Sequence, residues 1–498
     1  MTTPAVEPRR IDRRDAVLAC LIAVGLMGLF VAVQKGRVSS YDGKIALATA
    51  RAISAGRLHL EPADDVYRAN LPYSHYGIGM PLLILPLYLL QRALHAQPNM
   101  LETLASPLLL ASAAVLLYLS GRELGWSRRV SLAAALVFGA LTMGLQLSQE
   151  VLSEPGVAFS TALLVLGMLR WRAGRWGGPW LAGFGVGTGL LFRGDSALLL
   201  GAGLLLLPAL VPWRRLLRER WAWLGLALPV VAALVWTGWY SMLRDGTIVP
   251  QVYGGSFRTP MLLGLDGLLL SHGKSMFVYN PFLLLAIPGA VLLWRRDRSA
   301  AALLLVLVVA RPLFYARWSD LFGGVTWGPR FLMPSVGPLS LLAVYAVSQI
   351  PRLHLALRVP AALVVAALVA ASGVVSVASV WVPYEAAWKW SVTAPADLHL
   401  EGAALRSYVA ARHHAFIYSL GDSAISFNLR HITHDNRFFP LTHFRGGAEP
   451  IGIVGLVAAG LAPLAAWVLG RPGRRGGPAA DEPPPEAAVA ASQGAARD

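Results

Sequence analysis

Apolar runs of about 16–22 residues recur along nearly the whole chain and are separated by polar loops. A helix of about 20 apolar residues spans the roughly 30 Å hydrocarbon layer of a membrane. Charged residues make up only 14% of the 498 residues, whereas soluble domains carry about 25%. The mean hydropathy of +0.55 agrees with this contrast. We therefore predict an all-α polytopic membrane protein.

Loop composition predicts the topology. Arginine-rich segments, which stay on the cytoplasmic side of membranes, are the N-terminus and residues 121–129, 170–176, 213–220, 294–299, 351–358 and 470–475. About twelve crossings are then expected, at 16–34, 104–120, 130–147, 156–171, 178–192, 196–212, 221–241, 278–294, 300–315, 332–350, 359–382 and 450–469. Both termini are predicted to be cytoplasmic. The net charge of +16 is attributed to this bias, and no nucleic-acid binding is expected.

A long first external loop is predicted over 35–103, with two interfacial helices at 42–55 and 78–92. The second helix contains Pro81 and Pro86 and is too short to cross the membrane. The first helix has one apolar face, made by Ile45, Ala48, Ala52 and Ile53.

The predicted division of the chain follows from these segments. It comprises a cytoplasmic N-terminus (1–15), a transmembrane catalytic domain (16–382), an external loop region (383–449), a last crossing (450–469) and a disordered cytoplasmic tail (470–498).

Three acids on the external side are candidates for chemistry. Asp42 is a candidate general base, or alternatively the N-cap of the first interfacial helix. Glu150 is a candidate for orienting an acceptor or holding a divalent cation. Glu154 is a candidate substrate ligand, or alternatively a first-turn acid that favours the dipole of the following helix.

Three bases depart from the positive-inside rule. Arg193, Lys274 and Arg330 follow or precede apolar runs on the predicted external side, where a base needs a reason. Together they would make a phosphate site. For Arg193, an ion pair with Asp195 is an equally good explanation.

Several aromatic residues and histidines complete the candidate site. His75 could bond a substrate hydroxyl, and Tyr76, Tyr253 and Trp327 could stack on sugar rings or simply belong to the interfacial aromatic belt. The histidines after residue 410 lack metal-ligand spacing, so no resident metal is predicted, although a divalent cation is left open.

The order of these motifs resembles the GT-C superfamily of polytopic glycosyltransferases over about residues 15–350. Within this superfamily it resembles protein O-mannosyltransferases and aminoarabinose transferases, of the family 39 type. The resemblance is carried by "SYDGKIALATARAISAGRLHL", "YSHYGIGMPLLILPLYLL", "LSQEVLSEPGVAFSTALLVLGML", "GLLFRGDSALLL", "LLLSHGKSMFVYNPFLLLAIPG" and "GGVTWGPRFLMPSVGPLSLL". Two departures are Gly43, where many relatives have a second acid, and Met80, where many have a proline.

The resemblance implies a bacterial plasma-membrane enzyme that transfers one sugar from a polyprenyl-phosphate donor to a glycan, lipid or protein acceptor on the external face. In this scheme Asp42 is the base, with Glu150 assisting, and the three external bases bind the donor phosphate. The substitution is expected to invert the anomeric centre. The alternatives are another polytopic membrane transferase, or a glycolipid flippase or transporter.

Overall fold

The computed structural model describes residues 11–62, 64, 66–67, 72–248, 256–324, 326–393, 402–432 and 449–471. These residues form helices, turns and connecting segments, with no strand among them. The all-α prediction is therefore confirmed for this part of the chain. Tyr253 and residues 472–498 of the predicted tail lie outside it.

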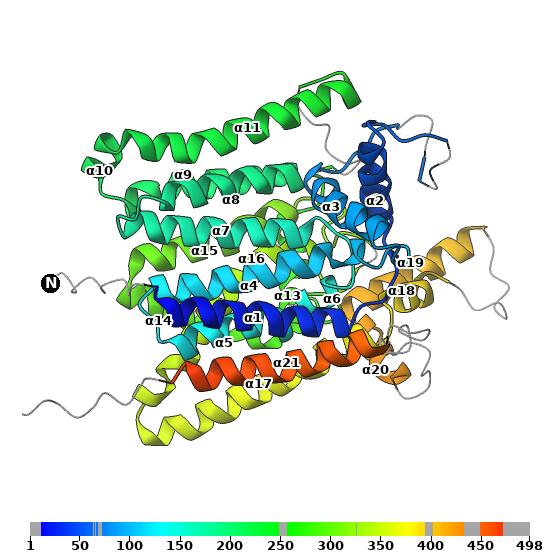
Figure 1. Ribbon diagram of the computed structural model, residues 1–498. Coiled ribbons are helices and arrows are strands. Elements are labelled where there is room, and N and C mark those ends of the chain that lie inside the picture. The colour runs from blue at the N-terminus through cyan, green and yellow to red at the C-terminus, as the bar shows by residue number, and fades with distance from the viewer. Residues whose placement is uncertain are drawn as a thin grey trace, which may run out of the picture.

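The body of the molecule is a bundle of helices whose axes lie roughly along one line (Figure 1). They are α1 Arg13–Ala32, α4 Ala105–Glu123, α5 Arg128–Ala140, α7 Glu154–Arg172, α8 Gly178–Phe192, α9 Ala197–Leu210, α11 Arg220–Asp245, α14 Ala286–Arg296, α15 Arg298–Tyr315, α16 Met333–Gln349, α17 Leu355–Trp381 and α21 Glu449–Leu469. Ten of the twelve predicted crossings each coincide with one of these helices, and the segments 130–147 and 278–294 coincide with one only in part. Within the described residues, seven helices are long and apolar enough to cross a membrane. The full count of crossings stays a prediction.

Two predicted crossings are interrupted. The segment 130–147 divides into α5 and the short α6 Gly144–Leu147, and the segment 278–294 divides before α14 at Pro281. Pro281 is the first residue of the helical turn that follows the break, a position where its missing backbone N–H group is not needed. The two breaks meet, since the side chain of Asn280 accepts a hydrogen bond from the Met143 backbone nitrogen at 2.7 Å.

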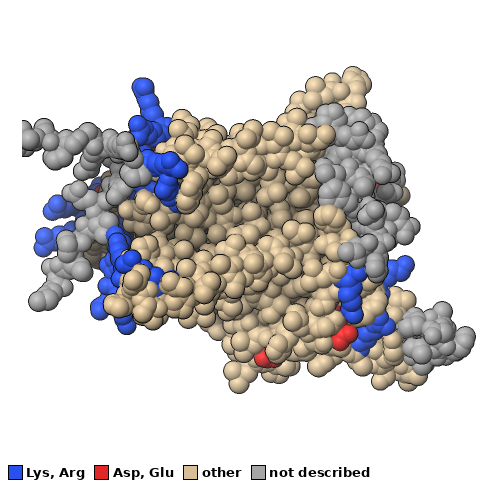
Figure 2. Space-filling view, turned by 90° about the horizontal axis from the view of Figure 1, so that it is seen from below, with Lys and Arg blue, Asp and Glu red and all other residues tan. Residues whose placement is uncertain are grey.

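The two ends of the bundle differ in character. The arginine-rich connections lie at the end where α1 begins, and the loops predicted to be external lie at the other end (Figure 1). Figure 2 shows Lys and Arg side chains gathered mainly at the first end, beside a broad band of uncharged surface. Such a band is what a bilayer-spanning protein presents to lipid.

At the second end, α2 Tyr41–Ser54 lies across the bundle direction with α3 Gly79–Ala93 beside it (Figure 1). Both helices occur where two interfacial helices were predicted. The face of α2 that carries Ile45 and Ala48 is buried, as the apolar pattern predicts. Three further helices share this end, namely α18 Tyr384–Val392, α19 Gly402–Tyr418 and α20 Ala424–His431.

Short elements connect the long helices. They are η1 Glu102–Leu104, η2 Gly194–Ser196, α10 Trp213–Arg218, α12 Met261–Leu265, η3 Asp266–Leu270, α13 Met276–Tyr279, η4 Pro281–Leu285, η5 Arg330–Leu332 and η6 Ile350–Arg352.

Candidate active site

A cavity of about 1230 Å³ opens at the end of the bundle where α2 and α3 lie. One part of its wall is polar and includes Asp42, His75, Tyr76, Arg193 and Arg330. The wall is mostly apolar along α8, α9 and α15, whereas α11 contributes two aromatic rings together with polar and charged side chains. The cavity therefore joins a charged pocket to a hydrocarbon-like channel between helices.

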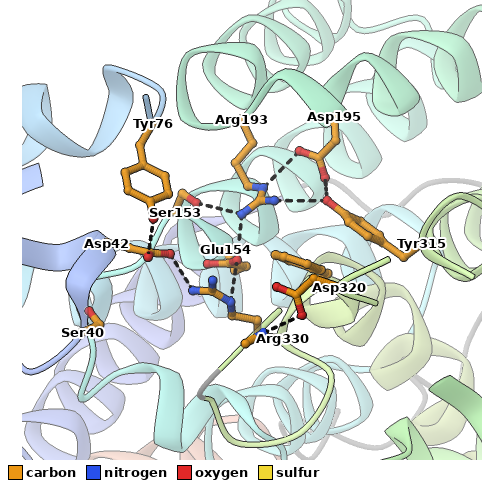
Figure 3. Close-up of polar contacts among 12 residues, drawn as sticks. Ser40, Asp42, Tyr76, Ser153, Glu154, Arg193, Asp195, Tyr315, Asp320 and Arg330 are labelled. Carbon is orange, nitrogen blue, oxygen red and sulfur yellow. Dashed lines mark hydrogen bonds and ion pairs between the residues drawn. The ribbon is translucent and has the colours of Figure 1, made fainter. Parts of the chain in front are cut away.

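Asp42 stands in the first turn of α2, but it does not cap that helix. The hydroxyl of Ser40 takes this role and accepts a hydrogen bond from the Gly43 backbone nitrogen at 3.2 Å. Asp42 Oδ1 instead accepts a hydrogen bond from the Tyr76 hydroxyl at 2.5 Å, and its Oδ2 lies 2.8 Å from Arg330 Nη1 (Figure 3). The cap interpretation of Asp42 is thus wrong, and its carboxylate points into the charged pocket.

The electrostatic environment of Asp42 favours the ionised form. Burial alone would raise the pKa of this carboxyl. The charge of Arg330 and the hydrogen bonds from Tyr76 and Arg330 outweigh burial and hold the pKa of Asp42 below its usual value. The side chain is therefore a carboxylate at neutral pH.

Arg330 reaches the pocket past a glycine that leaves room for it. Gly323 has φ of +78°, a left-handed conformation that favours glycine, and a Cβ atom there would lie 2.6 Å from Arg330 Cγ. Beyond its contact with Asp42, Arg330 places Nε 3.4 Å from Glu154 Oε1. The close approach of Arg330 to the Gly323 backbone explains why a glycine-rich segment precedes this buried base.

Arg193 is presented by the C-terminal end of α8. Its Nη1 donates to Glu154 Oε1 at 2.8 Å and its Nε donates to Asp195 Oδ1 at 3.1 Å. Its guanidinium also lies 4.6 Å from the centre of the Phe331 ring. The predicted ion pair with Asp195 is therefore present, and Arg193 still lines the cavity.

These contacts belong to one chain of alternating charges, which we call the charge chain. Three guanidinium groups and three carboxylates succeed one another within ion-pair distance, so their formal charges cancel. In order, the members are Arg311, Asp195, Arg193, Glu154, Arg330 and Asp42. Figure 3 shows the members from Asp195 to Asp42 following one another across the site.

Two members of this environment were not predicted. Arg311 Nη1 lies 2.9 Å from Asp195 Oδ2, and the Tyr315 hydroxyl donates to the same oxygen. Both residues lie in α15, inside a predicted crossing. A lone base in an apolar run is a functional candidate by default, so Arg311 carried a usable signal.

Loop 72–78 carries His75 and Tyr76 into the cavity wall. Gly77 allows this loop to lie on the end of α8, because a Cβ atom there would be 2.3 Å from the Leu191 carbonyl oxygen. The rings of His75 and Tyr76 lie 4.2 Å apart, centre to centre. Both residues are therefore placed where a substrate in the cavity would meet them.

Glu150 lies in a separate cluster, outside the cavity wall. Its carboxylate accepts from Lys35 Nζ at 2.6 Å and from the Ser39 hydroxyl at 2.9 Å. Lys35 also lies 3.6 Å from Glu385. Among the described residues, no group of three or more His, Cys, Asp or Glu side chains is arranged to hold a metal ion.

Lys274 and Trp327 are fully buried and do not line the cavity. Lys274 Nζ donates to the Gly324 carbonyl at 3.2 Å and to the Tyr384 hydroxyl at 3.0 Å. Burial lowers the pKa of the Lys274 amine to about 7. Trp327 packs edge-on against Tyr279, with ring centres 5.0 Å apart.

Residues 79–239 match the protein family described as dolichyl-phosphate-mannose-protein mannosyltransferase. This segment includes Glu154 and Arg193, whereas Asp42 and Arg330 lie outside it. The match confirms the predicted resemblance to protein mannosyltransferases and, with it, the expected class of enzyme, a glycosyltransferase. No curated protein matches the chain.

Several solved structures are similar to the chain. ArnT from Cupriavidus metallidurans in the apo state is 16% identical over 91% of this chain and 76% of its own, with a TM-score of 0.49. The same protein bound to undecaprenyl phosphate is 18% identical over the same shares, with a TM-score of 0.48. The archaeal oligosaccharyltransferase AglB from Archaeoglobus fulgidus, in complex with an inhibitory peptide and a dolichol-phosphate, is 14% identical over 82% of this chain and 60% of its own, with a TM-score of 0.46.

Proposed function

We propose that this multi-pass membrane protein transfers one sugar from a polyprenyl-phosphate donor to an acceptor, at the membrane face where α2 and α3 lie. The observation that carries the proposal is the cavity, whose wall has a charged part, with Arg193, Arg330 and Asp42 among its members, and an apolar part between helices. A lipid-linked phosphosugar has the same division into a charged head and a hydrocarbon tail.

The guanidinium groups of Arg193 and Arg330 would bind the donor phosphate. Arginine pairs with phosphate oxygens through two parallel N–H groups, and both side chains reach the cavity wall. We assign the phosphate to these two bases rather than to Lys274, because the Lys274 amine lies outside the cavity among aromatic rings.

The prenyl chain would lie along the apolar wall formed by α9 and α15. Leu205 lines this wall and is also 71% exposed on the bundle. The channel therefore reaches the outer surface of the bundle, which faces lipid in a membrane. A long hydrocarbon chain can then extend into the bilayer while its phosphate sits in the charged pocket.

Asp42 would act as the general base. The acceptor hydroxyl gives its proton to the Asp42 carboxylate while the acceptor oxygen forms a bond to the anomeric carbon. The bond from that carbon to the phosphate oxygen breaks, and its electron pair leaves on the polyprenyl phosphate. Arg193 and Arg330 would stabilise the negative charge that the phosphate gains. One base without a covalent nucleophile predicts inversion of the anomeric centre.

The arginine-rich end of the bundle would face the cytoplasm, together with both termini. In a bacterium the charged pocket would then open at the periplasmic face of the plasma membrane. The acceptor would be a glycan, a lipid or a protein exposed on that face.

The function is tested by mass spectrometry of lipid-linked sugars and envelope glycans in cells with the gene, without it, and with the Asp42→Asn variant. We expect one sugar modification to be lost in both the deletion and the variant, with its polyprenyl-phosphate donor accumulating. An Asp42→Asn variant that restores the modification fully would rule out Asp42 as the base. Identical glycan and lipid profiles in all three strains would rule out the proposed activity.

A further inference from the structure

The three carboxylates of the charge chain differ in exposure and in the number of arginines that they contact. Glu154 is 1% exposed and lies within ion-pair distance of two arginines. Asp195 is 9% exposed, contacts two arginines and also accepts from Tyr315. Asp42 is 19% exposed and, among the described residues, has an ion pair with Arg330 alone. Asp42 is therefore the member that an incoming anion can replace most easily.

The contacts of Asp42 conflict with the full strength of a general base. A base must reach the acceptor hydroxyl within about 2.6–3.2 Å and hold enough proton affinity to take its proton. Asp42 Oδ1 accepts from the Tyr76 hydroxyl, and Oδ2 lies 2.8 Å from Arg330 Nη1. Each oxygen keeps a second acceptor site, but the ion pair with Arg330 stabilises the carboxylate and weakens it as a base.

A donor phosphate would resolve the conflict. Phosphate oxygens compete well for a guanidinium group, because they accept two charge-assisted hydrogen bonds in parallel. Arg330 would keep its position during such an exchange, since its Nε stays beside the fully buried Glu154. Asp42 would keep its orientation through Tyr76.

We propose that the donor phosphate replaces Asp42 as the partner of Arg330, and that this exchange releases the Asp42 carboxylate to accept the proton of the acceptor. The inference rests on the proposed function and adds an order to it. The donor binds first, and the base becomes competent only while a donor is bound. Such an order protects the enzyme from activating an acceptor, or water, in an empty site.

The exchange is tested by measuring the affinity of purified protein for a long-chain polyprenyl phosphate in detergent, using intrinsic tryptophan fluorescence. Asp42→Asn removes the competing charge and should bind the lipid phosphate about tenfold more tightly than the wild type, the effect of one charge-assisted hydrogen bond. Glu61→Gln is a matched control, because Glu61 pairs with Arg57 in the same loop but outside the cavity. Its affinity should equal that of the wild type.

A double variant identifies the source of the gain. In an Arg330→Gln background, Asp42→Asn should no longer improve binding, because the arginine for which the two anions compete is gone. A gain that persists without Arg330 would reflect a general change of charge and would overturn the exchange.

The outcomes separate the two proposals. Lipid phosphate that binds the wild type and Asp42→Asn with equal affinity overturns the exchange and leaves the donor class intact. Failure of every variant and the wild type to bind overturns the proposed function and the exchange together. A structure of the wild type with polyprenyl phosphate bound gives a check that needs no variant. We expect Asp42 and Arg330 to be separated beyond 4 Å, the outer limit of an ion pair, and an intact pair at 2.8 Å would overturn the exchange.

Discussion

Glu154→Gln is the sharpest test of the charge chain, because Glu154 is its most deeply buried carboxylate. The substitution keeps the shape of the side chain and removes the charge that lies between Arg193 and Arg330. Breaking a buried ion pair by removing one partner costs about 3–5 kcal/mol. The glutamine oxygen can still accept from Arg193, and such a bond returns about 1 kcal/mol. We therefore expect the free energy of unfolding to fall by about 2–4 kcal/mol.

The assay is a denaturant titration of the detergent-solubilised protein, with the unfolded fraction followed by tryptophan fluorescence. Glu61→Gln makes the same chemical change in an exposed pair with Arg57 and should cost less than about 1 kcal/mol. Polyprenyl phosphate should restore part of the stability lost in Glu154→Gln, since it supplies the missing negative charge. A Glu154→Gln variant that is no less stable than Glu61→Gln would refute the view that Glu154 holds the two arginines in place.

Three further predictions follow from other features. Burial lowers the pKa of Lys274 to about 7, so between that pH and 10.5 the unfolded chain binds more protons than the folded one and stability rises with pH. Thermal scans should show this rise in the wild type and not in Lys274→Met, and identical profiles would exclude Lys274 as its source. Gly77→Ala places a Cβ atom within 2.4 Å of two carbonyl oxygens of α8 and should lower the rate of sugar transfer at least about tenfold. Gly373→Ala is the control, because Gly373 has open space around it, and it should leave the rate unchanged. In a cysteine-free background, a cysteine at Ser127 should react only with reagents applied from the cytoplasmic side, and one at His95 only from outside; reaction from the other side would reverse the topology.

Sequence reasoning located the charged pocket because its residues violate the positive-inside rule. Arg193 and Arg330 stand out as bases on a side that is otherwise poor in them, and both reach the cavity. Their convergence with Asp42 was not readable from the chain, since 288 positions separate Asp42 from Arg330. Only the packing of α2 against the bundle end brings them together.

Side-chain direction explains what the sequence left undecided. Lys274, like Arg330, is a base on the predicted external side. Its amine contacts the ring and the hydroxyl of Tyr384 and does not reach the cavity. Glu150 lies near Glu154 in sequence, but it pairs with Lys35 in a different cluster. Neither direction is encoded in a local pattern, because both depend on partners from distant segments.

Arg311, in the interior of α15, is a case in which a local sequence pattern does carry the signal. The apolar run around Arg311 predicts a membrane crossing, and a helix is observed there. A guanidinium in such a run is costly, and this cost indicates a functional role that the crossing pattern alone does not reveal.

The balance of three arginines against three carboxylates has a consequence for selectivity. Because these six charges are paired with one another, the charge chain exerts little net pull on anions dissolved in the surrounding water. Inorganic phosphate or sulfate would have to dislodge an internal carboxylate unaided, whereas a ligand with a prenyl tail is already concentrated in the bilayer beside the channel. The enzyme would thus distinguish membrane-borne from water-borne phosphate, because every anion that enters must compete with the Asp42 carboxylate for Arg330.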